Sequence, residues 1–185
     1  MLRPFALIAL LTFSPLLLAD NARLREANFP VQHCTEQPCL ELKNQSVLVY
    51  LWVDVYVAAL YMEPGISASK ALDERRDKRL ELYYPRNIDR EDVIKAAWVT
   101  LQRQHGKAEL DALRSELDAL HASFLSIRPK DRYAINYRGE RGMSLERNGD
   151  VVFKSTNPAL ADAYLGLWLA PEGLSDDLRT ELLKD

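Results

Sequence analysis

The stretch of residues 47–62 constrains the fold more than any other part of the sequence. Its sequence is VLVYLWVDVYVAALYM, which is apolar except for Asp54. The β-branched and aromatic residues that dominate it fit the pleated surface of a sheet better than a helix. We therefore predict one long central strand over residues 47–62.

A period of two gives this predicted strand two faces of different chemistry. The odd-numbered side chains are aliphatic apart from one tyrosine, and form a surface that helices can cover. The even-numbered side chains form an aromatic face with a single carboxylate, and they include Tyr50, Trp52, Asp54, Tyr56 and Met62.

A transmembrane helix is the alternative for the same stretch. A helical span needs about 20 apolar residues, and an aspartate near its centre costs at least ~2.5 kcal/mol. The run of 16 residues is shorter than that and has Asp54 in its middle. Both properties favour the strand.

The N-terminus has the pattern of a signal peptide. Arg3 supplies a positive charge, residues 5–18 are mostly apolar, and Ala19 is a small residue at which a signal peptidase can cut. We predict cleavage after Ala19 and a periplasmic or secreted location. Residues 20–185 then form a single domain with no transmembrane span. An uncleaved N-terminal anchor is the alternative.

The overall charge gives no indication of a nucleic-acid partner. The chain has 185 residues, a formal charge of −3 and a pI near 5.7, whereas nucleic-acid binding normally requires a basic surface. The length suits one domain with a substantial core.

The two cysteines are close together in the sequence HCTEQPC. Cys34 and Cys39 lie after the predicted cleavage site and therefore in an oxidising compartment. We predict a disulfide that closes this short loop. His33 raises the alternative of a metal site, but two cysteines and one histidine do not complete a tetrahedral set. We expect no metal and no cofactor.

Hydrophobic periodicity, caps and turn residues predict the other elements. Two short strands are expected around the cysteine turn within residues 28–43, with a turn at residues 44–46. Later strands are expected at residues 78–84, 131–137, 143–147 and 151–155, and the first of these should be half exposed. Helices are expected at residues 67–75, 90–104, 107–126, 157–169 and 175–183. Asn148 and Gly149 predict a two-residue hairpin turn, because both tolerate a positive φ.

The sequence contains no catalytic signature. It has no nucleophile elbow, no phosphate-binding glycine loop and no H-E-x-x-H motif. The histidines His33, His105 and His121 are scattered along the chain.

Six segments, in their order and spacing, resemble the bacterial chalcone isomerase-like proteins. They are VDVYVAALYM, KRLELYYPR, IDREDVIKAAW, DRYAINY, MSLERNGDVVF and ALADAYLGLWLAPEGLSDDLRTELL. The resemblance covers roughly residues 45–183. It implies an α+β fold, an open-faced β-sandwich in which helices cover one side of a curved antiparallel sheet.

The polar residues that plant chalcone isomerases use for cyclisation are largely absent. Where those enzymes have a threonine on the central strand, the resemblance places Tyr56. It places Ile88, Glu91 and Lys95 near their tyrosine, lysine and asparagine. For their arginine it offers only Lys43, with Leu48 where bacterial relatives often carry a basic residue. We therefore expect no chalcone isomerase activity.

These observations favour an exported, non-catalytic protein that binds a small apolar or amphipathic ligand, such as a fatty acid or an aromatic compound. The aromatic face of residues 47–62 and the fatty-acid-binding relatives of the family support this hypothesis. The expected ligand-binding residues are Tyr50, Trp52, Asp54, Tyr56, Met62, Lys43 and Lys95, with Asp54 or Lys43 orienting a polar end of the ligand.

Several alternatives remain open at this point. The aromatic face is equally consistent with an ordinary core, and Asp54 with a pair to Arg132 or Arg79. An isomerase or lyase would act on an enone-like substrate through Tyr56, Asp54 and Lys95. A structural or partner-binding envelope protein would have its cleft filled by side chains.

Overall fold

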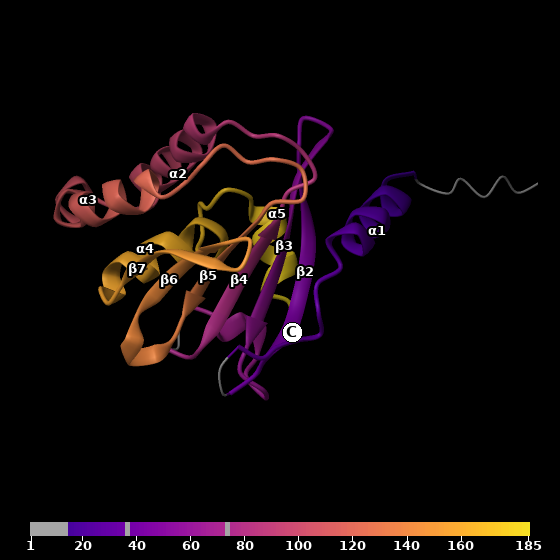
Figure 1. Cartoon of the computed structure of the whole chain (residues 1–185), viewed down its shortest axis with the longest axis horizontal. Helices are drawn as coiled ribbons and strands as arrows, with labels where there is room; N and C mark the ends of the chain where they lie inside the picture. The colour runs from indigo at the N-terminus through magenta and orange to yellow at the C-terminus, as the bar shows by residue number, and fades with distance from the viewer. Residues whose placement is uncertain (1–14, 36–37, 73–74) are drawn as a thin grey trace, which may run out of the picture.

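The computed structural model describes residues 15–35, 38–72 and 75–185. Within these ranges, seven antiparallel strands form one sheet in which each strand lies beside its neighbour in sequence (Figure 1). The strands are β1 (Gln32–His33), β2 (Leu40–Tyr50), β3 (Val53–Met62), β4 (Lys78–Tyr83), β5 (Arg132–Tyr137), β6 (Met143–Arg147) and β7 (Asp150–Ser155).

Five helices cover this sheet in the described part of the chain. They are α1 (Pro15–Ala27), α2 (Arg90–Gln104), α3 (Lys107–Ala122), α4 (Pro158–Leu169) and α5 (Asp176–Leu182). Residues of α2 to α5 share one large hydrophobic core with the sheet, while α1 packs with a smaller cluster on the opposite face. Figure 1 shows α1 beside β2, apart from α4 and α5. The predicted α+β fold with a curved antiparallel sheet is confirmed, and α1 adds a cover on its second side.

Residues 47–62 form a hairpin, so the prediction of one long strand there is wrong. β2 ends at Tyr50 and β3 begins at Val53, and these two residues pair with each other. Leu51 and Trp52 make the turn, with φ of 47° and 67°. Turns with two positive φ angles usually contain asparagine or glycine, so the apolar composition of this turn concealed it.

Two other predicted boundaries near this hairpin are also wrong. The turn expected at residues 44–46 is absent, because β2 runs through these residues with only a register shift between Leu42 and Asn44. The helix expected at residues 67–75 is a single 3₁₀ turn over Ala68–Lys70, and residues 73–74 lie outside the described ranges. The strands flanking the cysteine turn are present as β1 and the start of β2.

A β-bulge in β3 decides which side chains reach the inner face, the face covered by α2 to α5. Leu48 pairs with Tyr56 and Val49 pairs with Asp54, so Val55 is an extra residue in β3. A bulge of this kind interrupts the alternation of faces. Val55 and Tyr56 therefore both lie on the inner side, while Asp54 lies on the side of α1.

β4 is buried along its whole length, where the sequence suggested a half-exposed strand. It lies in the middle of the sheet, and its outer face is covered by the segment that follows α1. Arg79 donates to Glu81 and Glu146 at 3.0 and 2.6 Å. Because these buried charges are paired and hydrogen-bonded, the polar face of β4 is compatible with burial.

The N-terminal segment is attached to the sheet by a disulfide and by side chains of α1. Cys34 and Cys39 form the predicted disulfide, with a Cα–Cα distance of 4.4 Å. Arg23 donates to Asp54 at 2.7 Å, and the Tyr83 hydroxyl donates to Glu26 at 3.0 Å. None of the helices in the described residues is long and apolar enough to cross a membrane.

Candidate ligand-binding cavity

The inner face of the sheet and the helices above it enclose a cavity of about 480 Å³. Strands β2 to β6 form its floor, α2 and α4 form its cover, and Ile88, Phe124 and Leu174 close it from the connecting segments. Its lining is mainly aliphatic and aromatic. Volume and lining both match those of small-molecule sites in proteins.

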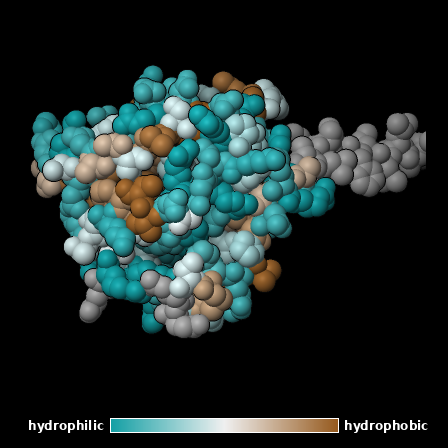
Figure 2. Space-filling model, viewed as in Figure 1, coloured by the Kyte–Doolittle hydropathy of each residue, from teal (hydrophilic) through white to brown (hydrophobic). Residues whose placement is uncertain are grey.

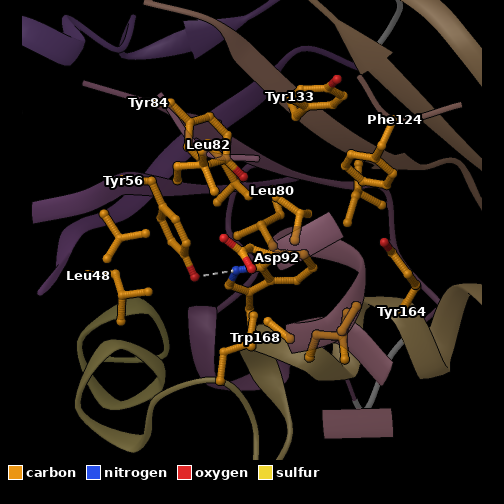
Figure 3. Close-up of a pocket in the computed structure, with 18 of the residues that line it drawn as sticks. Leu48, Tyr56, Leu80, Leu82, Tyr84, Asp92, Phe124, Tyr133, Tyr164 and Trp168 are labelled. Carbon is orange, nitrogen blue, oxygen red and sulfur yellow. Dashed lines mark hydrogen bonds between the residues drawn. The ribbon is translucent and has the colours of Figure 1, made fainter. Parts of the chain in front are cut away.

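Aromatic side chains from distant parts of the chain converge on this cavity. Figure 3 shows Tyr56, Tyr84, Tyr133 and Tyr164 around it, with Trp168 of α4 beside Tyr56. The ring centroids of Tyr56 and Tyr84 are 5.6 Å apart, and those of Tyr84 and Tyr133 are 6.3 Å apart, both in edge-on geometry. Such contacts hold the rings in fixed positions.

The tyrosine hydroxyls are neutral and differ in whether they are already hydrogen-bonded. Burial raises the pKa of Tyr56, Tyr84 and Tyr164 above the ordinary value of 10. The Trp168 indole N–H donates to the Tyr56 hydroxyl at 2.8 Å, and the Leu125 amide donates to that of Tyr133 at 3.2 Å. The Tyr84 and Tyr164 hydroxyls have no partner among the described residues, so they are available to a ligand.

The cavity contains almost no charge. Apart from the tyrosines, Asp92 near the start of α2 is the only titratable residue among those described as lining it, and the lining includes no lysine or arginine. The carboxylate of Asp92 belongs to an exposed residue. The arrangement therefore offers hydroxyl groups in an apolar interior, and no cation to neutralise an anion there.

Two of the predicted ligand-binding residues line the cavity, and one more lies close to it in the core. Tyr50 and Tyr56 both contribute to the lining. Met62 is fully buried on the same face of β3, but it lies toward the other end of the strand and does not line the cavity. The part of the cavity lining that comes from β2 and β3 was therefore predicted in part.

The other four predicted residues lie elsewhere, and the expectation that they face one cleft is wrong. Trp52 is at the tip of the β2–β3 hairpin and is 90% exposed. Asp54 faces α1 and binds Arg23, not Arg79 or Arg132 as the sequence suggested. Lys43 pairs with Glu41 at 3.0 Å, and Lys95 is exposed on α2. The unrecognised turn and bulge account for Trp52 and Asp54.

Sequence reasoning missed most of the aromatic lining. Tyr84 directly follows β4, Tyr133 lies in β5, and Tyr164 and Trp168 lie in α4. Tyr164 and Trp168 lie on the inner side of the helix predicted at residues 157–169, and Tyr84 lies at the end of the strand predicted at 78–84. The sequence did not reveal the order of the strands in the sheet, and this order brings the aromatic side chains together.

The positions that the resemblance aligned with plant catalytic residues are separated in space. Leu48, Tyr56 and Ile88 line the cavity, whereas Glu91 and Lys95 are exposed on α2. The cavity thus lies where the resemblance placed the cleft. The three positions in it that align with plant catalytic residues carry the phenol of Tyr56 and the aliphatic side chains of Leu48 and Ile88. No group of histidine, cysteine, aspartate or glutamate residues in the described ranges is placed to hold a metal ion.

The sheet, its helices and the enclosed space define an α+β protein with an internal apolar cavity. The chain belongs to the chalcone isomerase-like family, because the family model matches residues 22–184. Among solved structures, it is similar to a fatty-acid binding protein of Arabidopsis thaliana. The TM-score is 0.58 and the identity 15%, over 84% of this chain and 90% of that chain. This likeness concerns the fold. The search of curated proteins found no match.

Proposed function

We propose that this chain is an exported, non-catalytic binding protein for a small apolar or amphipathic ligand. The observation that carries the proposal is the cavity of about 480 Å³ on the inner face of the sheet. The solved fatty-acid binding protein with the same fold supports the same class of ligand. Fatty acids and aromatic compounds are the two classes considered.

The lining favours a ligand whose buried part is uncharged. A carboxylate in an apolar interior needs a cation or several donors, and the lining residues offer no lysine or arginine. The free hydroxyls of Tyr84 and Tyr164 can instead bind a carbonyl, hydroxyl or phenol group. A fatty acid would therefore place its chain inside and its carboxylate at the entrance, near Tyr50.

The enone isomerase hypothesis has less support from the geometry. Tyr56 is in the cavity and hydrogen-bonded to Trp168, but Asp54 lies on the opposite face of the sheet and Lys95 on the exposed side of α2. These three side chains therefore cannot act on one substrate. The hypothesis of a purely structural protein expected a filled cleft, which the cavity volume disfavours.

Export is part of the proposal and is compatible with the fold of the N-terminal segment. Cleavage after Ala19 would remove the first turn of α1 and retain Arg23, Leu24 and Ala27, which contact the sheet. The disulfide between Cys34 and Cys39 suits an oxidising compartment. N-terminal sequencing of protein from the periplasmic fraction tests this part, with Asp20 expected as the first residue.

A matched pair of variants on α2 tests ligand binding. Ala97 is buried and lines the cavity, while Val99 on the same helix is 53% exposed and does not. Ala97→Phe should fill the cavity and abolish the fluorescence increase of the neutral aromatic probe N-phenyl-1-naphthylamine. Val99→Phe should bind the probe like the parent chain.

Two results would contradict the proposal. One is equal probe binding by the parent chain, Ala97→Phe and Val99→Phe, which would place the probe outside the cavity. The other is the absence of any lipid or aromatic compound from solvent extracts of the purified protein, combined with no binding of this probe or of cis-parinaric acid. If only cis-parinaric acid bound, the expected preference for an uncharged buried group would be wrong.

A further inference from the structure

The hairpin of β2 and β3 projects beyond the rest of the sheet. The pairing of β3 with β4 ends at Val57 and Tyr83, whereas β2 and β3 continue to pair with each other as far as Tyr50 and Val53. Trp52 lies five positions before Val57, which corresponds to about 16 Å at about 3.3 Å per residue. Figure 1 shows this hairpin standing above the other strands.

The tip of this hairpin is apolar and exposed. Val49, Tyr50, Leu51 and Trp52 are four consecutive residues with exposed fractions of 44, 67, 73 and 90%. Figure 2 shows hydrophobic surface at the top edge of the molecule, where Figure 1 places the hairpin. A run of exposed apolar residues of this kind on a protein surface indicates an interaction site.

The geometry of the turn does not explain these side chains. Leu51 and Trp52 both have a positive φ, which is less favourable for them than for asparagine or glycine. The hairpin of β6 and β7 makes its turn with Asn148 and Gly149, at φ of 53° and 92°. The β2–β3 hairpin thus exposes apolar groups at a position where polar residues would suit the backbone better.

Exposed basic side chains lie at the same end of the sheet as the hairpin. The segments before α2 and after α3 lie at the same end of the sheet and are bridged by Ile88 and Ile127. They carry the exposed residues Arg86, Arg128 and Lys130, and Arg86 and Arg128 have no ion-pair partner among the described residues. These cations complement the negative charge of anionic lipid headgroups.

We propose that the tip of the β2–β3 hairpin, residues 49–52, inserts into the surface of a phospholipid bilayer. Tryptophan and tyrosine prefer the interface between hydrocarbon and headgroups, and Leu51 adds an aliphatic group that enters the hydrocarbon boundary. The projection of the hairpin lets these side chains reach the bilayer ahead of the rest of the sheet. Arg86, Arg128 and Lys130 then face the headgroups.

This orientation brings the entrance of the cavity to the bilayer. Tyr50 is 67% exposed at the tip and also lines the cavity, as does Val55 below it. An apolar molecule moving between the bilayer and the cavity would pass along these side chains without crossing bulk water. The docking surface itself does not depend on whether a ligand occupies the cavity.

A double substitution in the turn provides the test. Leu51→Asn with Trp52→Gly removes both apolar side chains and suits the positive φ angles of the turn, so the variant should fold at least as stably as the parent. We expect its affinity for vesicles of equal parts phosphatidylcholine and phosphatidylglycerol to be about tenfold lower or weaker still. Flotation assays measure the affinity, and a blue shift of tryptophan fluorescence reports insertion of Trp52.

The control is Val31→Asn, which removes a residue that is 79% exposed at the opposite end of β2. It should leave vesicle binding unchanged. All three proteins carry the same N-terminus, so any contribution of the N-terminal segment cancels in the comparison. They should also bind N-phenyl-1-naphthylamine equally, which separates this proposal from the function of the cavity.

The proposal is overturned if the parent chain does not float with these vesicles. It is also overturned if the double variant floats as well as the parent. Concentration-dependent dimerisation of the parent that the double variant lacks, without vesicle binding, would assign the tip to a second copy of the chain instead.

Discussion

Both faces of the central strands β3 to β5 are buried, but they differ in what buries them. The inner face is apolar, contacts α2 to α5 and contains the cavity. The outer face carries a network of charged and polar side chains, covered by α1 and the segment after it. Arg79, Glu81, Asn136, Glu146 and Arg132 form this network through bonds of 2.6 to 3.0 Å.

This difference between the charged outer face and the apolar inner face shows how the fold combines a rigid sheet with an internal cavity. Paired charges on the outer face have strict geometric requirements and fix the register of the central strands. The inner face is left free of charge, so a cavity there stays apolar. The predictions below test this division from the largest expected effect to the smallest.

Arg79→Met should destabilise the fold most. The side chain of Arg79 is 6% exposed and donates to Glu81, Asn136 and Glu146. Its removal leaves Glu146 without its cationic partner and Glu81 with Arg132 alone, so we expect a loss of about 3–5 kcal/mol in the free energy of unfolding, measured by urea denaturation.

The control for Arg79→Met is Arg114→Met, which breaks an exposed pair with Asp118 on α3. It should cost less than about 1 kcal/mol. Equal effects of the two substitutions would show that the outer network does not stabilise the sheet.

Lowering the pH should destabilise the chain through His121 on the inner side. This side chain packs between Trp98 and Tyr164, neither ring nitrogen has a hydrogen-bond partner in the described structure, and burial lowers its pKa from 6.5 to about 4. The unfolded chain therefore binds the proton more tightly. Stability should be complete above pH 6.5 and fall by about 3 kcal/mol as the pH drops to about 4.

His121→Leu should reduce this pH dependence, measured as the midpoint of urea unfolding at pH 7.5 and pH 5. Burial also lowers the pKa of His33, so part of the dependence should remain, and His33→Leu should remove it. An unchanged slope in His121→Leu would mean that this histidine is protonated as easily in the folded chain as in the unfolded one.

Tyr56→Phe should have an intermediate effect. The Tyr56 hydroxyl accepts the only hydrogen bond that the Trp168 indole donates among the described residues, so the substitution leaves a buried donor unsatisfied. We expect a loss of about 1–3 kcal/mol in the free energy of unfolding, measured by thermal and urea denaturation. A loss below about 0.5 kcal/mol would indicate that water replaces the hydroxyl.

The two faces also show what sequence could and could not predict. Strand and helix positions from residue 78 onward were confirmed closely, including α2 and β6, because their hydrophobic periodicity is strong and proline, glycine or asparagine residues mark their ends. The apolar turn at Leu51 and Trp52 was missed, because it lacks the usual turn residues. The bulge at Val55 was also missed, because it depends on pairing with Leu48 and Val49, which a single strand does not reveal.

Asp54→Asn should have the smallest effect, and it tests the assignment of faces directly. Asp54 pairs with Arg23 at 2.7 Å, with side chains 23 and 38% exposed. Because this pair is partly solvated, its loss should cost less than about 1 kcal/mol, measured by urea denaturation.

The same substitution should leave binding of N-phenyl-1-naphthylamine unchanged, because the bulge turns Asp54 away from the cavity. Tyr56→Phe, one residue beyond the bulge, is the comparison and should alter the binding. If Asp54→Asn weakened probe binding at unchanged stability, Asp54 would have to reach the cavity. The separation of an ion-paired outer face from an apolar inner face would then fail at this end of β3.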